Sequence, residues 1–194
     1  MSGLEKKTVE AKFFDLDDII AKSECTSCSF NMDQLNPDFF QEMLGISKPT
    51  QNPDGYGADA PLWLLESVKT PFIIHLPQAY SPKMQGVLNA DSKNVNLARM
   101  QQQFYTNGMQ LCHLMKMSEE QNGALNLAKC LLSTLTQRLG GVLSNSVHQR
   151  TKGEKFDILE SKVFLEGKRC KEDIDRWLRQ DGKSMMSKKR KRIS

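Results

Sequence analysis

The sequence predicts a mainly α-helical protein with a small α/β domain at its N-terminus. Three observations support this fold class. The chain has 194 residues, of which 39% are hydrophobic and 26% charged, as is usual for a globular protein. All seven prolines lie at or before Pro82, so the residues that follow can form long helices without interruption. Beyond that point, apolar residues recur at helical spacing.

The end of the proline-rich part, near Pro77 and Pro82, predicts a domain boundary. We expect a small α/β domain with a turn-rich linker over residues 1–80, a helical domain over 81–180 and a disordered basic tail over 181–194. The longest apolar run covers only residues 62–65, whereas a helix that spans a bilayer needs about 20 such residues. We therefore expect no membrane segment.

Short elements are expected in the first half of the N-terminal part. Residues 13–20 form an element whose apolar period distinguishes neither helix nor strand, and residues 25–30 are compatible with a weak strand. Asn36 and Pro37 favour the start of a short helix that Gly45 ends, because asparagine caps helices and proline suits the first helical position.

The second half of this part is expected to hold a turn, a helix and a strand. Residues 48–57 are rich in turn-forming types, and the helix is expected to begin at 59–61 and continue into the apolar run. Residues 72–76 are partly β-branched and lie between two prolines, which predicts a strand.

The helical part shows a clearer period. Ser81 and Pro82 predict a short helix that ends near residue 90, and residues 118–121 match a capping box at the start of a later helix. Between them, one helix is predicted by an apolar stripe with spacings of three, four, seven and three residues: Leu97, Met100, Phe104, Leu111 and Leu114.

Two further helices complete the predicted fold. The first, over residues 119–148, has an apolar face wider than a single narrow stripe, which indicates contact with more than one neighbour. Gly140 and Gly141 within it suggest a bend or close packing. The second is expected over residues 154–180. The wide face of the first comprises Leu125, Leu127, Leu131, Leu132, Leu135, Leu139, Val142 and Leu143.

The net charge of +4 belongs to the C-terminal tail. Residues 183–192 hold six basic residues and no acidic one, so the rest of the chain is mildly acidic. The N-terminus shows no apolar core of signal-peptide length, and an odd count of five cysteines fits reduced thiols inside a cell. We expect a nuclear protein, because the basic cluster resembles a short nuclear-import signal: Lys188, Lys189, Arg190, Lys191 and Arg192. The alternative is a solvated end of the chain that no import receptor recognises.

The search for catalytic or metal-binding residues predicts no enzyme and no cofactor. Cys25 and Cys28 form a single C-x-x-C pair without the further ligands of a zinc site. Residues 182–184 match only the end of a phosphate-binding loop. The remaining titratable candidates have no partner at catalytic spacing and are better explained by packing or helix capping: His75, His113, His148, Asp15, Asp17 and Asp18. Wide apolar helix faces without such a site point to a subunit that binds other proteins.

Several stretches occur together in an order that resembles the third Psf-type subunit of GINS, the four-subunit eukaryotic replication complex. The resemblance runs from Phe13 to Gln180, with modest departures at 60–65 and at 90–92. The stretches are residues 13–20, 60–65, 74–80, 88–97, 104–108 and 159–177.

The resemblance implies a helical A domain preceded by a small β-containing B domain, packed with three sister GINS subunits. It also implies that the complex joins the MCM helicase ring and the Cdc-type cofactor in the CMG replicative helicase, without a catalytic site, a small-molecule substrate or a direct contact to DNA. We expect helices over 95–117 and 119–148 to bury apolar faces against sister subunits. The expected interface residues are Phe104, Leu111, Leu125, Leu132, Leu135, Leu139 and Leu143.

A free-standing nuclear adaptor that binds DNA through its basic tail is the alternative function. It would bind DNA in a salt-sensitive way and would lose that binding on deletion of residues 183–194.

Overall fold

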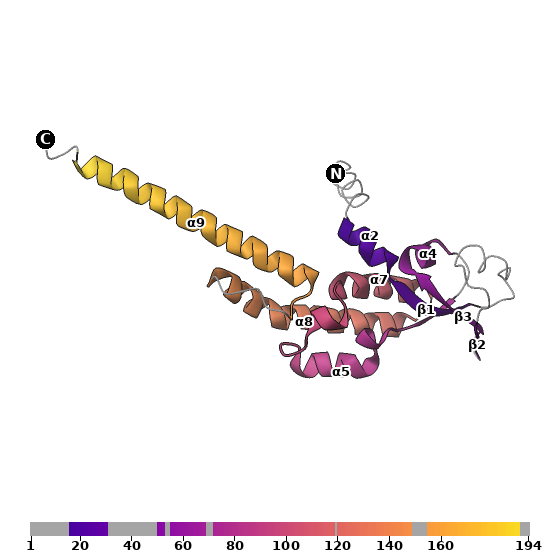
Figure 1. The fold of residues 1–194 in the computed structure, drawn as a ribbon. Coiled ribbons are helices and arrows are strands. Elements are labelled where there is room, and N and C mark those ends of the chain that lie inside the picture. The colour runs from indigo at the N-terminus through magenta and orange to yellow at the C-terminus, as the bar shows by residue number, and fades with distance from the viewer. Residues whose placement is uncertain are drawn as a thin grey trace.

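A computed structural model describes residues 16–30, 50–52, 55–68, 72–118, 120–148 and 155–190. A small sheet lies at one end of the molecule, and helix α9 (Ile158–Arg190) projects from the other end (Figure 1). Between them lie helices α5 (Pro82–Asp91), α7 (Phe104–Met117) and α8 (Gln121–Val147). The observed fold, mostly helical with a small sheet near the N-terminus, confirms the predicted fold class. Within the described ranges, no helix combines the length and the apolar character that a membrane span requires.

The sheet has four antiparallel strands in the order β2-β3-β1-β4. The strands are β1 (Cys25–Phe30), β2 (Thr50–Asn52), β3 (Gly55–Pro61) and β4 (Phe72–His75), so the strands predicted at 25–30 and 72–76 are both present. Strand β1 pairs with β3 on one side and with β4 on the other. Ala58 and Ala60 of β3 are buried. The sequence predicts a turn and a helix start in this segment, but its pairing with β1 makes it a central strand.

Two short helices accompany the sheet. The element expected at residues 13–20, for which the sequence does not distinguish helix from strand, is helix α2 (Leu16–Ser23). Helix α4 (Leu62–Ser67) follows Pro61 and buries Leu62, Leu64 and Leu65. The helix expected from Asn36 lies outside the described residues.

The helical part begins with a 3-10 turn and two short helices. These are η1 (Gln78–Tyr80), α5 (Pro82–Asp91) and α6 (Leu97–Met100). Ser81 caps α5 as predicted, since its hydroxyl oxygen accepts a hydrogen bond from the Met84 amide at 3.4 Å. The stripe predicted as one helix is divided between α6 and α7 (Phe104–Met117), because Gln101 leaves the helical conformation and ends α6.

Helix α8 (Gln121–Val147) is continuous through its glycine pair, and α9 runs from Ile158 to Arg190. The predicted capping box is wrong: the first residue of α8 follows Glu120, and the Ser118 hydroxyl donates instead to the Met115 carbonyl at the end of α7. Residues 181–190, expected to be disordered, form the last part of α9; they contain no proline and are rich in lysine, methionine and arginine, which favour helices.

One hydrophobic core joins the sheet to the helices. Phe30 and Ile74 from the strands belong to the same cluster as Phe104 and Leu127 from α7 and α8. Tyr80 lies where the two parts meet: its ring stacks on Phe104 at 5.1 Å, and its hydroxyl donates to the Phe104 carbonyl at 2.8 Å. The core is thus continuous across the expected boundary at 80–81, and the division into two domains stays a prediction.

The end of α8 lies against the beginning of α9. Gly167 permits this close approach, because a Cβ at this position would collide with the side-chain oxygen of Ser146. Beyond this contact α9 leaves the body of the molecule, as its yellow end in Figure 1 shows.

Candidate protein interaction surface

Helix α8 is apolar on two sides. One side faces the core and buries Leu127, Leu131 and Val142, which are at most 6% exposed. The other side carries a second apolar row with spacings of seven, seven, four and four residues, which places its members on one face of a helix. We call this row the α8 outer stripe: Leu125, Leu132, Leu139, Leu143 and Val147.

The α8 outer stripe is open to solvent in the single chain. Leu132 is 64% exposed and Leu125 is 53% exposed, while Leu139 is half-buried. Among the residues of α8, the only charged ones are Lys129 and the buried Arg138. A helix face that stays in water normally carries many charges, so the composition of α8 indicates a face that another protein covers.

The interface residues expected from sequence fall into three groups. Leu125, Leu132 and Leu143 are exposed, and Leu135 and Leu139 are partly buried. Phe104 and Leu111, in contrast, are 0% and 2% exposed and belong to the core of the chain itself, because α2, α4 and α8 all pack around α7. A partner therefore cannot reach these two side chains in this structure, which corrects that part of the expectation.

Helix α9 presents a second exposed apolar group that the expected interface did not include. Ile174, Trp177 and Leu178 are each more than half exposed and follow the i, i+3, i+4 spacing of one helix face. They lie beyond the contact between Gly167 and Ser146, where α9 projects from the body. The same spacing is readable in the sequence, but it does not show that this part of the helix lacks a neighbour among the described residues.

A buried ion pair fixes the junction of α8 and α9. Arg138 of α8 is 5% exposed and Glu160 of α9 is 1% exposed. The Arg138 Nε and one terminal nitrogen donate to the two Glu160 oxygens at 2.6 and 2.9 Å, which is the bidentate geometry of strong arginine–carboxylate pairs. The Tyr105 hydroxyl of α7 also donates to Glu160, at 2.9 Å.

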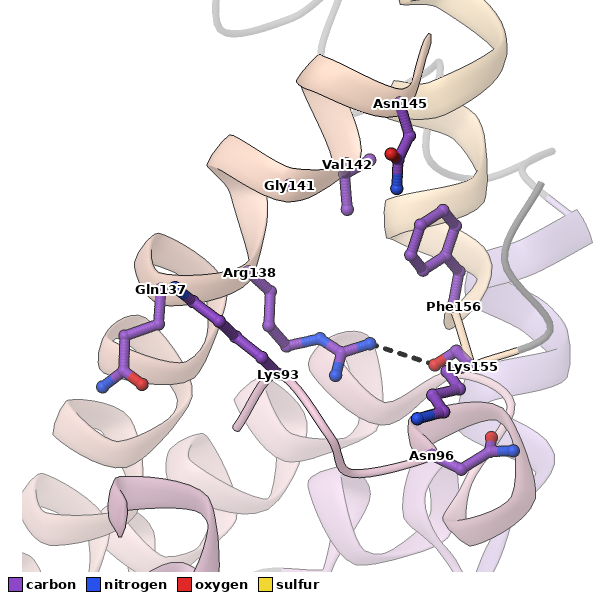
Figure 2. A pocket seen from close by; sticks show the side chains of 9 residues that line it. All are labelled: Lys93, Asn96, Gln137, Arg138, Gly141, Val142, Asn145, Lys155 and Phe156. Carbon is purple, nitrogen blue, oxygen red and sulfur yellow. Dashed lines mark hydrogen bonds between the residues drawn. The ribbon is translucent and has the colours of Figure 1, made fainter. Parts of the chain in front are cut away.

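Arg138 also holds the chain segments beside the junction. Its terminal nitrogens donate to the carbonyls of Ser92, Val95 and Lys155 at 2.6, 2.9 and 3.0 Å. Figure 2 shows the guanidinium group and its bond to Lys155. All five N–H groups of the guanidinium thus have acceptors. Burial alone lowers the pKa of Arg138, but hydrogen bonds and the charge of Glu160 outweigh it, so the pKa is raised and the group stays charged.

Asp157 caps two helices at once. One carboxylate oxygen accepts from the Glu160 amide at 2.9 Å in the first turn of α9, and the other accepts from the Tyr105 amide at 3.3 Å in the first turn of α7. Burial raises the pKa of this carboxyl, while the backbone hydrogen bonds oppose that rise. One side chain therefore ties the starts of both helices to the ion pair.

Replacing Asp157 with alanine is expected to destabilise both helix starts by about 2–3 kcal/mol, because two buried amides lose their acceptor. The measurement is amide hydrogen exchange, which should become faster at Tyr105 and Glu160. Asp157→Asn retains one acceptor oxygen and should show a smaller change. Unchanged exchange at both amides in the alanine variant would contradict the double-capping role.

The other sequence candidates do not come together in the structure. Cys25 is exposed, whereas Cys28 is buried, and burial raises the pKa of the Cys28 thiol to about 12. His75 lies beside Ser29, with 2.7 Å between its Nε2 and the hydroxyl oxygen. Throughout the described part of the chain, no group of three or more His, Cys, Asp or Glu side chains is arranged to hold a metal ion.

Of the remaining candidates, His113 lies in α7 and His148 follows α8, while the others lie towards the two ends of the chain. Asp17 pairs with Lys162 of α9, and Asp18 pairs with Lys22 of its own helix, so both have structural roles; Asp15 lies outside the described residues. The predicted import signal is only partly covered. Its residues Lys188, Lys189 and Arg190 end α9, while Lys191 and Arg192 lie outside the described residues.

Comparison with known proteins gives consistent results. Residues 79–179 match the family model described as Sld5, GINS complex protein helical bundle domain. The chain is also similar to proteins named DNA replication complex GINS protein PSF3. It is 25% identical to those of Bos taurus and Homo sapiens and 26% identical to that of Mus musculus, in each case over 179 residues that cover 87% of this chain and 81% of the relative.

Proposed function

Because this chain belongs to the GINS family, as a Psf3-type subunit that serves DNA replication, we propose that it is a structural, non-catalytic subunit of the four-subunit GINS complex. Its partners are three sister GINS subunits. Through the assembled complex it contributes to the CMG helicase together with the MCM ring and the Cdc-type cofactor. It works in the nucleus and meets DNA only through that assembly.

The second apolar side of α8 is the observation that carries this proposal. A helix of 27 residues with one exposed charge and a stripe of exposed leucines needs a second protein to cover it. Obligate subunit interfaces commonly exceed about 2,000 Å² and resemble a divided hydrophobic core. The buried ion pair between Arg138 and Glu160 supports the same function, because it holds α8 and α9 in a fixed relation before they meet a partner.

Purification of the tagged chain from nuclear extract tests the proposal. We expect three sister GINS subunits in equal amounts, with MCM and the Cdc-type cofactor bound to a fraction of the material that depends on replication. A soluble monomer that unfolds cooperatively and carries none of the sister subunits would contradict it.

Deletion of residues 183–194 distinguishes the proposal from the DNA-binding adaptor. We expect the truncated chain to assemble normally, because Ile174, Trp177 and Leu178 precede the deletion, and to accumulate less in the nucleus because the basic cluster is lost. Sister-subunit binding and nuclear fluorescence of a tagged chain measure the two effects. Salt-sensitive DNA binding by the full chain alone, lost on truncation, would favour the adaptor instead.

A further inference from the structure

A pocket of about 540 Å³ lies beside the junction of α8 and α9 (Figure 2). Among the described residues, its charged lining residues are Lys93, Lys155 and Arg138, and none of the described residues that line it is acidic. Phe156, which is partly exposed, adds apolar surface next to the buried Val142, and Asn145 adds a side-chain amide. A cavity with cationic and amide groups beside an apolar wall fits a ligand that has both negative charge and an apolar part.

The cations of this pocket differ in what they can bind. Arg138 has all of its N–H groups engaged by Glu160 and by backbone carbonyls, so it forms part of the wall and cannot donate to a ligand. Lys93 and Lys155 are exposed. The Lys155 ammonium makes one long hydrogen bond, 3.4 Å, to the Asn94 carbonyl. These two lysines are the groups that can receive a negative charge.

Arg138 holds the backbone that carries both lysines. It binds the carbonyls of Ser92 and Val95, which flank Lys93, and the carbonyl of Lys155 itself. The two chain segments therefore share one buried guanidinium group as a donor, and they also bond to each other through the Leu97 amide and the Lys155 carbonyl at 3.2 Å. A site whose walls are fixed before binding loses less conformational entropy when a ligand arrives.

The glycine pair of α8 points to a close approach from outside the chain. A Cβ added at Gly140 or Gly141 would meet no atom of the described residues within 4 Å, so packing within the described part of the chain gives no reason for either glycine. Each glycine costs about 1 kcal/mol relative to alanine inside a helix. Gly141 lines the pocket, and its missing side chain leaves room for a backbone that lies against α8.

We propose that this pocket binds an acidic polypeptide segment of a partner protein, with an apolar side chain against Phe156 and Val142 and carboxylates beside Lys93 and Lys155. The proposal goes beyond subunit assembly, since the pocket and the α8 outer stripe comprise different residues. A nucleic acid fits less well, because the described residues offer only two available cations here and the chain without its tail is mildly acidic.

Fluorescence anisotropy on the assembled four-subunit complex tests the proposal. The probe is a short fluorescein-labelled peptide in which Asp and Glu residues flank one Phe. We expect saturable binding that weakens at least about tenfold in the double variant Lys93→Glu/Lys155→Glu, because two attractive charges become repulsive. Gly141→Leu keeps the charge and fills the pocket, so it should weaken binding as well.

Matched controls make the outcome specific. The variant Lys83→Glu/Lys168→Glu changes the net charge equally at exposed lysines outside the pocket and should change the affinity less than about twofold. A probe with Ser in place of Phe should bind more weakly. Equal losses in both double variants, no binding to the wild-type complex, or stronger competition by a single-stranded oligonucleotide than by unlabelled peptide would overturn the proposal.

Assembly of each variant is measured separately by size-exclusion chromatography with light scattering. Normal assembly without peptide binding would refute the pocket and leave the proposed function intact. A wild-type chain that does not assemble would refute the proposed function instead. If only the pocket variants fail to assemble, while the control variant assembles, a sister subunit occupies the pocket and the proposal is wrong.

Discussion

Replacing Arg138 with methionine is expected to lower the stability of the α8–α9 junction by about 3–5 kcal/mol. Glu160 would remain buried without its bidentate partner, and the carbonyls of Ser92, Val95 and Lys155 would lose their donor. Removing one partner of a buried ion pair costs far more than the pair itself contributes, because the remaining charge stays in a poorly solvated site. Amide hydrogen exchange in the first turn of α9, measured in the assembled complex, would show the loss.

A second substitution isolates this effect. The double variant Arg138→Met/Glu160→Leu removes both charges and fills similar volume, so it is expected to recover most of the loss. The recovery is expected to be incomplete, because the three carbonyls lose the Arg138 donor and the Tyr105 hydroxyl loses the Glu160 acceptor. A loss below about 1 kcal/mol in the single variant, or a double variant that only adds the two single effects, would contradict the role assigned to this pair.

Leu132→Glu is expected to release the chain from the GINS complex. Leu132 is 64% exposed, so the substitution should change the stability of the chain itself by no more than about 0.5 kcal/mol. In the complex, the new carboxylate would be buried in an apolar interface without a partner. We expect the affinity for the sister subunits to fall at least about 100-fold, as for a central interface residue. The fraction of tagged chain that elutes with the sister subunits measures the effect.

Leu165→Glu serves as the matched control. Leu165 is 56% exposed, and its position on α9 is opposite to that of Ile174, on the side away from the exposed apolar group. This variant should therefore assemble normally. Equal assembly by the Leu132 and Leu165 variants would show that the α8 outer stripe is not an interface.

The sequence predicts the long helices well, because their apolar period is local information. It does not predict which apolar positions face the core. Leu131 and Leu132 are adjacent and chemically identical, yet one is 6% and the other 64% exposed. The difference depends on which side of α8 meets α7, and that is decided by contacts between distant parts of the chain. For the same reason, the apolar stripe predicts an interface role for Phe104 and Leu111, which the core buries instead.

Other features depend on partners that are far apart in sequence. Strand β3 contains glycine, proline and aspartate, and its strand conformation follows from its pairing with β1. Arg138 and Glu160 lie on different helices, and neither has a local signal of burial or pairing. Asp157 is a recognisable cap for α9, but its bond to the Tyr105 amide of α7 depends on tertiary packing. The apolar period of the sequence thus predicts where the helices lie. The residues that hold the helices together, such as Arg138, Glu160 and Asp157, are identified only by contacts between distant parts of the chain.

Hydroxyl-radical footprinting of the assembled complex tests the central claim, that a sister subunit covers the outer side of α8. The oxidation rate of Leu132, corrected for the intrinsic reactivity of leucine, is compared with that of Leu127, which is 1% exposed within the chain itself. If a sister subunit covers this side, both leucines are protected to a similar degree. Oxidation of Leu132 at the rate of a solvent-exposed leucine would contradict it.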